Sequence, residues 1–267
     1  MTDTNLDQAV VDASARLAAA ASTGVVCAPV RDLIGADDGA AYAVQQRGLV
    51  IRIAAGASIV GRKIGLTSEA VQQQLGVDRP DFGVLLDDMA YADGAALPVA
   101  RLLQPKVEAE VAFVLAADLT AGPFDAETVA KAVDYTVAAL EIVDSRIAGW
   151  DITFADTVAD NASAGLFVLG TEQVRLDRFV PREAAMELSL NDVVVSKGSG
   201  AASLGDPLAA LAWLASTAVE MGAPLLAGDV VLSGALGPVV PVGAGDVVTA
   251  TISGLGSVRA SFVEGSV

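Results

Sequence analysis

The strongest constraint on the fold lies in residues 104–115, QPKVEAEVAFVL, where polar and apolar residues alternate before the run becomes wholly apolar. In a strand, Glu108 and Glu110 point to the same face, with their Cβ atoms roughly 7 Å apart. The opposite face is apolar throughout, and the glutamate face becomes apolar from Ala112 onward. We therefore expect this strand to enter a core. Its carboxylates are either solvated glutamates, the ordinary case, or a pair that shares one hard cation.

Two further ionisable residues lie among apolar neighbours. Glu141 is the fifth residue of VAALEIV, residues 137–143, a run typical of a buried strand or helix end. Lys63 lies in SIVGRKIGL, residues 58–66, which predicts a short strand interrupted by glycines.

A site built from these carboxylates favours a particular chemistry. Three carboxylate ligands select a hard ion such as Mg²⁺ or Mn²⁺ and leave about half of an octahedron open for a chelating substrate. They also outweigh a divalent ion by one negative charge. Lys63 is the candidate to offset that charge, and apolar surroundings that lower its pKa would fit it for proton transfer. A solvated loop lysine is the alternative interpretation.

Helical spacing of apolar residues predicts two packing helices near the N-terminus. The first carries Leu6, Val10, Ala13 and Leu17 on one stripe and ends at Gly24. The second is capped by Asp37 or Asp38 and ends at Gly56. Its predicted buried stripe is Tyr42, Leu49, Val50 and Ile53.

The C-terminal half is rich in strands. Residues 186–197 predict a hairpin about Asn191 and Asp192, and Asp206 caps a helix that extends to about residue 220. Three β-rich runs follow, which favours a barrel or rolled sheet over βαβ repeats. By contrast, DITFADTVADNAS, residues 151–163, is polar enough for a surface Ω-loop.

Composition excludes several functions. A net charge of −17 argues against binding to nucleic acid or an anionic membrane. The single cysteine, Cys27, forms no internal disulfide and excludes a structural Cys-zinc site, and no secretory signal is evident, so we expect a cytoplasmic protein. The absence of histidine excludes Ser-His-Asp and Cys-His hydrolysis. GSGAASLG, residues 198–205, lacks the third glycine of a dinucleotide fingerprint.

Five blocks, in order along nearly the whole chain, resemble a known family. They are GRKIGLTSEAVQQQLGVDRPDFGVL, QPKVEAEVAFVL, ALEIVDSRI, DTVADNASAG and LSGALGPVVPVGAGD. Together they are similar to the 2-keto-4-pentenoate hydratases, also called 2-hydroxypenta-2,4-dienoate hydratases, of the fumarylacetoacetate hydrolase superfamily.

The resemblance implies roles for individual residues. Its E-x-E pair and later glutamate imply that Glu108, Glu110 and Glu141 hold a divalent cation, Mg²⁺ or Mn²⁺. It implies that Lys63 and Asp81 serve proton transfer and water activation. The implied substrate contacts are Leu75, Gly76 and Ser163.

For the whole protein, the resemblance implies an α+β fold in which a mixed β-sheet rolls into a barrel-like core with peripheral helices. We expect a helical segment, residues 1–57, packed on a catalytic rolled-sheet domain, residues 58–267, as one structural unit. A homo-oligomer is also implied, with pentamers and decamers among its forms.

The implied activity is that of a lyase, a metal-dependent hydratase of meta-cleavage aromatic catabolism. It converts 2-hydroxypenta-2,4-dienoate (2-oxopent-4-enoate), a small anion, to 4-hydroxy-2-oxopentanoate. The lack of histidine departs from the hydrolytic branch of the superfamily, with its His-Glu water activator. Two alternatives stay open: a decarboxylase of 2-oxo-3-hexenedioate (4-oxalocrotonate), which would use the same chelate, and a non-catalytic metal-binding scaffold for a partner enzyme.

Overall fold

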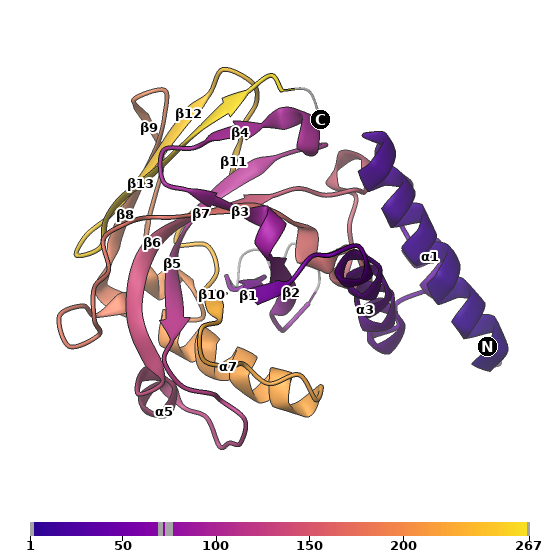
Figure 1. Ribbon diagram of the computed structural model, residues 1–267, viewed down its shortest axis with the longest axis horizontal. Helices are drawn as coiled ribbons and strands as arrows, with labels where there is room; N and C mark the ends of the chain where they lie inside the picture. The colour runs from indigo at the N-terminus through magenta and orange to yellow at the C-terminus, as the bar shows by residue number, and fades with distance from the viewer. Residues whose placement is uncertain (1–2, 69–71, 73–76, 266–267) are drawn as a thin grey trace.

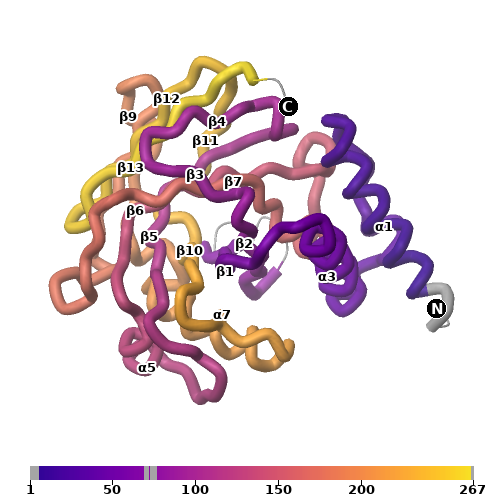
Figure 2. The backbone as a smooth tube through the Cα atoms, in the orientation of Figure 1, coloured from indigo at the N-terminus to yellow at the C-terminus, as the bar shows by residue number. Residues whose placement is uncertain are grey.

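The computed structural model describes residues 3–68, 72 and 77–265 (Figures 1 and 2). The described α-helices are α1 (Asp3–Thr23), α2 (Arg31–Ile34), α3 (Asp38–Ala54), α5 (Ala126–Ala130), α6 (Phe154–Ala159) and α7 (Pro207–Glu220). Short 3-10 helices are η1 (Asp87–Met89), η2 (Val99–Arg101), η3 (Ala148–Trp150), η4 (Asn161–Ser163), η5 (Pro181–Glu183) and η6 (Gly200–Ala202).

The strands form two sheets. The larger has the order β2-β1-β10-β5-β6-β7-β3, with β11 also paired to β5. Its strands are β1 (Ile59–Gly65), β2 (Asp81–Leu86), β3 (Ala90–Ala92), β5 (Lys106–Leu115), β6 (Val133–Val143), β7 (Ala164–Leu169), β10 (Val230–Leu232) and β11 (Val240–Pro241). The smaller sheet, in the order β4-β13-β12-β8-β9, contains β4 (Ala96–Pro98), β8 (Ala185–Leu190), β9 (Val193–Ser199), β12 (Val247–Ile252) and β13 (Gly256–Val263).

Both sheets are mixed, because β1 pairs parallel with β10, β3 with β7 and β13 with β4, while the other pairings are antiparallel. The larger sheet is also strongly rolled. In a flat sheet, β1 and β6 would lie roughly 14 Å apart, three strand spacings. Instead, Lys63 of β1 and Glu141 of β6 form an ion pair 3.0 Å long across the concave side. The expected α+β fold, a rolled mixed sheet with peripheral helices, is confirmed.

The main core lies between the convex side of the larger sheet, the smaller sheet and α7. It takes one face of β5, including Val111 and Phe113, together with Val258 of β13 and Leu211 of α7. A second apolar cluster lies on the concave side and includes Ala112, Phe167 and Leu232. The helices α1 and α3 lie side by side beyond β1 and β2 (Figure 1), and contribute to a third cluster with α6. Strand β5 is thus buried on both faces, as its sequence predicts.

Most local sequence signals are confirmed. Asp37 caps α3 by accepting a hydrogen bond from the Ala40 N–H, and Asp206 caps α7 through the Leu208 N–H. The hairpin turn at Asn191 and Asp192 has positive φ at both residues, the geometry of a type I′ turn.

The predicted buried stripe of α3 is partly wrong. Leu49 is buried, but Val50 and Ile53 are 53% and 42% exposed. The helix instead buries Ala41, Val44 and Gln45, because its contacts with α1 and α6 turn this small-residue face inward.

The Ω-loop prediction for residues 151–163 is wrong. This segment forms α6 and η4, and it buries Asp156, Thr157, Asp160 and Ser163. Asp156, Thr157 and Asp160 form hydrogen bonds with other parts of the protein, which composition does not reveal.

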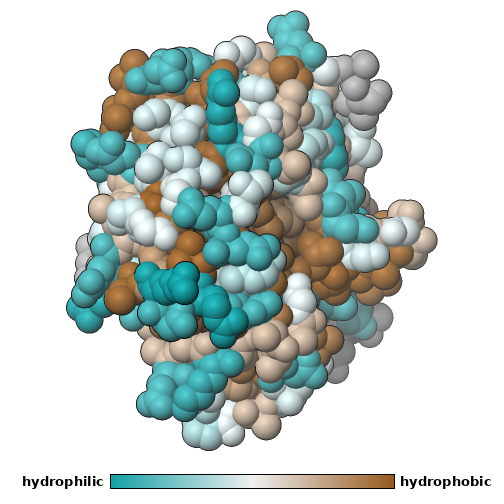
Figure 3. All heavy atoms as spheres, turned by 60° about the vertical axis from the view of Figure 1, so that its left-hand side comes forward, coloured by the Kyte–Doolittle hydropathy of each residue, from teal (hydrophilic) through white to brown (hydrophobic). Residues whose placement is uncertain are grey.

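One face of the molecule carries both polar and apolar residues at its surface (Figure 3). Figure 3 shows hydrophilic and hydrophobic residues interspersed on the face that carries the left-hand side of Figure 1. No helix in the described part of the chain is both long and apolar enough to cross a membrane.

Candidate metal centre and active site

Three carboxylates meet on the concave face of the larger sheet. Glu108 and Glu110 point to one side of β5, and the antiparallel register places Glu141 of β6 directly opposite Glu108. One oxygen from each carboxylate lies within 4.8 Å of the others. Glu110 and Glu141 are 0% and 1% exposed, whereas Glu108 is partly exposed. The strand pairing therefore brings the third glutamate close to the other two, which sequence spacing alone did not establish.

Lys63 is the cation of this cluster. Its Nζ lies 3.0 Å from Glu141 Oε1, and both side chains are buried. Burial by itself lowers the pKa of Lys63, but the charges of Glu141, Asp81, Glu108 and Glu110 more than offset it and leave the pKa above its usual value. The expected fall in the Lys63 pKa is therefore not found, and the residue is a buried ammonium group.

The cluster has more acceptor atoms than donors. Glu110 Oε2 accepts a hydrogen bond of 2.7 Å from the Gly234 N–H. In residues 3–68, 72 and 77–265, no donor reaches Glu110 Oε1 or either oxygen of Glu141, whose contact with Lys63 is an ion pair outside hydrogen-bond geometry. Buried polar atoms normally have partners. These oxygens are thus suited to a cation.

Burial and repulsion between carboxylates also raise the pKa values of Glu108 and Glu110. Burial, followed by the charge of Glu141, raises the pKa of Glu108 to about 7. The same two causes raise the pKa of Glu110 well above its usual value. A divalent cation would therefore compete with protons for the oxygens of Glu108 and Glu110.

Asp81 begins β2 and faces the same cluster. Its register partner on β1 is Gly65, where an added Cβ would lie 2.1 Å from Asp81 Oδ1. Asp81 Oδ2 accepts a hydrogen bond of 3.1 Å from the Thr157 hydroxyl, whereas Oδ1 has no donor in the described part of the chain. Burial raises the pKa of Asp81, although Lys63 opposes the rise. Asp81 is therefore a buried carboxyl group with a pKa above its usual value and with Oδ1 free to exchange a proton.

A strained turn closes one side of the cluster. Asn161, Ala162 and Ser163 have φ values of 54°, 51° and 54°, a left-handed conformation that costs about 1–2 kcal/mol for each L-residue. The Asn161 side chain anchors the turn to β2, accepting from the Val84 N–H and donating to the Val84 carbonyl. Ser163 is 3% exposed, and its hydroxyl has no partner among the described residues. The strain thus presents a free buried hydroxyl.

Gly83 lets this turn approach the cluster. A Cβ at Gly83 would lie 2.4 Å from the Asn161 carbonyl oxygen and 3.2 Å from Cδ of Lys63. A larger residue would displace the turn or the lysine stem, so this glycine is required by close packing.

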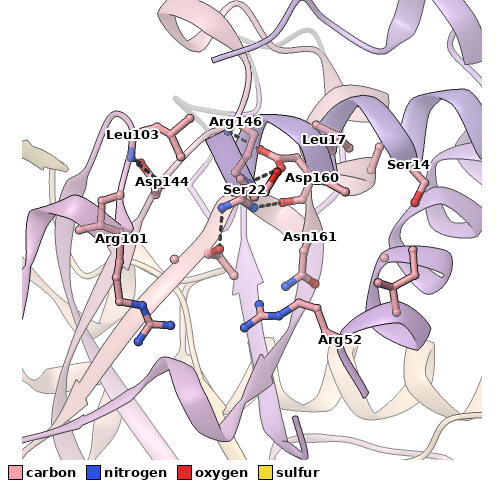
Figure 4. A pocket seen from close by; sticks show the side chains of 18 of the residues that line it. Ser14, Leu17, Ser22, Arg52, Arg101, Leu103, Asp144, Arg146, Asp160 and Asn161 are labelled. Atoms are coloured by element: carbon pink, nitrogen blue, oxygen red, sulfur yellow. Dashed lines mark hydrogen bonds and ion pairs between the residues drawn. The ribbon is translucent and has the colours of Figure 1, made fainter. Parts of the chain in front are cut away.

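A separate cavity of about 630 Å³ lies behind the turn, between α1, α3 and residues 100–103 (Figure 4). Its lining includes Arg52, Arg146 and Asp160 but none of the three glutamates. The charges there already have partners: Arg146 contacts Asp160 at 2.5 Å, Arg52 contacts Asp88 at 2.6 Å, and Asp144 accepts hydrogen bonds from the Leu103 and Gln104 N–H groups. Uncompensated charge is concentrated at the glutamates, and we place the candidate site there.

The structure brings together Lys63, Asp81, Glu108, Glu110 and Glu141. Ser163 borders them in the turn that packs on β2, while Leu75 and Gly76 lie outside the described residues. Sequence reasoning missed Thr157, Asn161 and Gly234 as supports of these side chains. The first two lie in the polar segment that was expected to be an exposed loop. The sequence showed their polar side chains but did not predict that the segment is buried.

Comparison with known proteins identifies the family. The sequence profile described as fumarylacetoacetate (FAA) hydrolase C-terminal matches residues 55–263. A 2-keto-4-pentenoate hydratase of Burkholderia vietnamiensis is 54% identical over 259 residues, covering 97% of this chain and 99% of the relative. A TodF product hydratase of Pseudomonas putida is 51% identical and covers 98% of each chain.

Solved structures show the same fold. A 4-oxalocrotonate decarboxylase from Pseudomonas putida G7, complexed with magnesium and adipate, aligns with a TM-score of 0.92 and 34% identity over 96% of this chain and 98% of its own. Fumarylpyruvate hydrolase from Pseudomonas aeruginosa, in complex with Mn²⁺ and pyruvate, is 16% identical, covers 76% of this chain and 88% of its own, and aligns with a TM-score of 0.60, a likeness of fold alone. The chain belongs to the fumarylacetoacetate hydrolase family, within its group of 2-keto-4-pentenoate hydratases.

Proposed function

We propose that this protein is a metal-dependent hydro-lyase that converts 2-hydroxypenta-2,4-dienoate to 4-hydroxy-2-oxopentanoate. The observation that carries the proposal is the cluster of Glu108, Glu110 and Glu141, with buried oxygens that lack donors in the described part of the chain. Relatives named as hydratases, more than half identical over nearly the full length, support the reaction.

The three glutamates would hold a divalent cation, for which Mg²⁺ and Mn²⁺ suit an all-oxygen carboxylate set. Such an ion supplies Lewis-acid stabilisation of the negative charge that develops at the C2 oxygen. Ions named with solved relatives, magnesium with the decarboxylase among them, support a divalent cation.

The remaining work is proton transfer by this chain's own residues. As the dienol is converted to the conjugated 2-oxo-3-enoate, its C2 hydroxyl loses a proton and C5 gains one, and Lys63, held as an ammonium group, can donate the proton to C5. Asp81, with its free Oδ1, can accept a proton from the water that adds at C4, and the reaction is completed by return of a proton to C3. Substrate binding by Ser163 and by the backbone of Leu75 and Gly76 is assigned by resemblance, and the unpartnered Ser163 hydroxyl supports its part of that assignment.

A decarboxylase of 2-oxo-3-hexenedioate is the second candidate. The specific observation in its favour is the TM-score of 0.92 with the 4-oxalocrotonate decarboxylase. The higher identity to relatives named as hydratases favours hydration.

One panel of assays tests both. Loss of dienoate ultraviolet absorbance is followed with Mg²⁺ or Mn²⁺, with and without a chelator, while carbon dioxide release is measured from the six-carbon diacid. Metal-dependent loss of dienoate without carbon dioxide release supports the hydratase. Carbon dioxide release as the faster reaction would replace it by the decarboxylase, and no turnover of either acid would reject both.

Three further properties stay predictions: a homo-oligomer, a cytoplasmic location and the division at residue 57. The start of the profile match at residue 55 supports the division.

A further inference from the structure

Exposure changes along one face of β5. Lys106 and Glu108 are partly exposed, whereas Glu110, two residues further on, is 0% exposed. In the part of the chain that the structure describes, solvent therefore reaches the glutamates from the start of β5. An entering substrate would pass Lys106, which lies on the same strand face as the two glutamates.

Lys106 is held in place at this entrance. Its Nζ lies 4.1 Å from the centroid of the Trp150 ring, a cation–π contact. The ring is fixed in turn, because Trp150 Nε1 donates to the Gln104 carbonyl at 3.1 Å. The Gln104 side chain donates to the Ser145 and Ile147 carbonyls and accepts from the Gly149 N–H.

The charge balance of the site calls for another cation. Glu108, Glu110, Glu141 and Asp81 provide four carboxylates. Among the described residues, Lys63 is the one lysine that forms an ion pair with them, and it lies against Glu141. When all four are ionised, a divalent cation and Lys63 still leave one negative charge, which repels an anionic substrate. Lys106 faces this excess charge: Glu108 is the carboxylate whose charge acts on it, and its ammonium group rests on an aromatic ring.

We propose that Lys106, held over Trp150 at the start of β5, is the entrance cation that binds the carboxylate of the incoming substrate anion. This inference rests on the proposed function and assigns its substrate-recognition residue. Lys106 is a binding residue, and Trp150 positions it.

The test measures anion binding directly. Pyruvate, the smallest 2-oxo acid, is titrated calorimetrically into the full-length Mn²⁺-loaded protein at about 50 and 300 mM salt, which shortens the Debye length roughly from 14 to 6 Å. The variants are Lys106→Met, which keeps the apolar stem, Lys106→Arg, which keeps the charge, and Lys131→Met. Lys131 is the matched control, because its side chain is 72% exposed on α5 and pairs with Glu127. Thermal melting confirms that each variant is folded.

We expect Lys106→Met to weaken pyruvate binding about tenfold at low salt and to flatten its salt dependence, the signature of one lost ionic contact. Lys106→Arg should bind within about twofold of wild type, and Lys131→Met should match wild type. In turnover, Lys106→Met should raise the KM for the dienoate and leave kcat nearly unchanged.

Unchanged pyruvate affinity in Lys106→Met, an equal loss in Lys131→Met, or no pyruvate binding by wild type would overturn the proposal. Adipate is titrated in parallel. If Lys106→Met weakens the binding of adipate but not of pyruvate, the proposal is also overturned, and Lys106 would instead bind the second carboxylate of a dicarboxylate. If wild type binds pyruvate through Lys106 but turns over no dienoate, the proposed function fails and the entrance cation stands.

Discussion

Two regions of the molecule bury carboxylates in opposite ways. Asp156 of α6 accepts five hydrogen bonds, from Val30 N, Arg31 N, the Arg31 guanidinium, Thr153 N and the Thr153 hydroxyl. Burial opposes its charge, yet these bonds hold its pKa below the usual value. In the glutamate cluster, burial and like charges raise the pKa of Glu108 to about 7. Donors satisfy a structural carboxylate, whereas the glutamate cluster keeps oxygens free for a cation.

The largest effect is expected from a substitution of Glu110, the most buried glutamate of the cluster. Glu110→Gln should abolish metal-dependent turnover of the dienoate, because an amide is a poor ligand for a hard cation and removes one of three charges. The melting temperature of the metal-free protein should stay equal or rise, since the substitution relieves repulsion. Turnover at the wild-type rate with metal, or a rate indifferent to a chelator, would reject the metal site.

Lys63→Ala tests the cation of the same region. It should lower kcat by about 10²–10⁴-fold, the usual contribution of general acid–base catalysis, in a protein that remains folded. Steady-state kinetics and circular dichroism measure the two effects. A variant that retains kcat would reassign Lys63 to a structural role.

The structural carboxylate should respond in stability rather than activity. Asp156→Ala leaves the Val30 and Arg31 N–H groups without an acceptor, and we expect a loss of about 3–5 kcal/mol in the free energy of unfolding. Urea denaturation measures that loss. If the variant keeps its stability but loses turnover per folded molecule, the proposed contrast between the two regions is wrong.

Asn161 shares features of both regions. Its side chain is hydrogen-bonded, like that of Asp156, and it holds the strained turn beside the glutamate cluster. Asn161→Asp keeps the acceptor for the Val84 N–H but loses the donor to the Val84 carbonyl. We expect kcat to fall about tenfold with a stability loss of about 1–2 kcal/mol, because the turn that carries Ser163 loosens. Equal kcat values would show that the turn does not position the substrate.

The smallest effect concerns pH. The folded-state pKa of Glu108, about 7, lies above its usual 4.5. Its contribution to the stability of the metal-free protein is therefore fully present below pH 4.5 and is lost as pH rises through 7. A divalent cation offsets this loss of stability by binding the ionised form of Glu108. The metal-induced rise in melting temperature should be greater at pH 8 than at pH 6 by about a few degrees, measured by calorimetry. An equal rise at both values would show that Glu108 does not share the cation.

Sequence alone determined several local elements and the candidate chemical groups. Alternation in residues 104–115 fixed the shared face of Glu108 and Glu110, the turn and cap residues fixed the hairpin and α7, and the lack of histidine restricted catalysis to other groups. These features are local, because they depend on periodicity and on the chemistry of each residue.

Only the tertiary structure decided which distant residues meet. The register of β5 with β6 set Glu141 against Glu108, and the roll of the sheet brought Lys63 to Glu141 across two intervening strands. The same packing buried the polar segment 151–163 and left Val50 and Ile53 of α3 exposed, contrary to its apolar stripe. Such contacts depend on strand register and sheet curvature. Many side chains together set both, so neither can be predicted from any single position of the sequence.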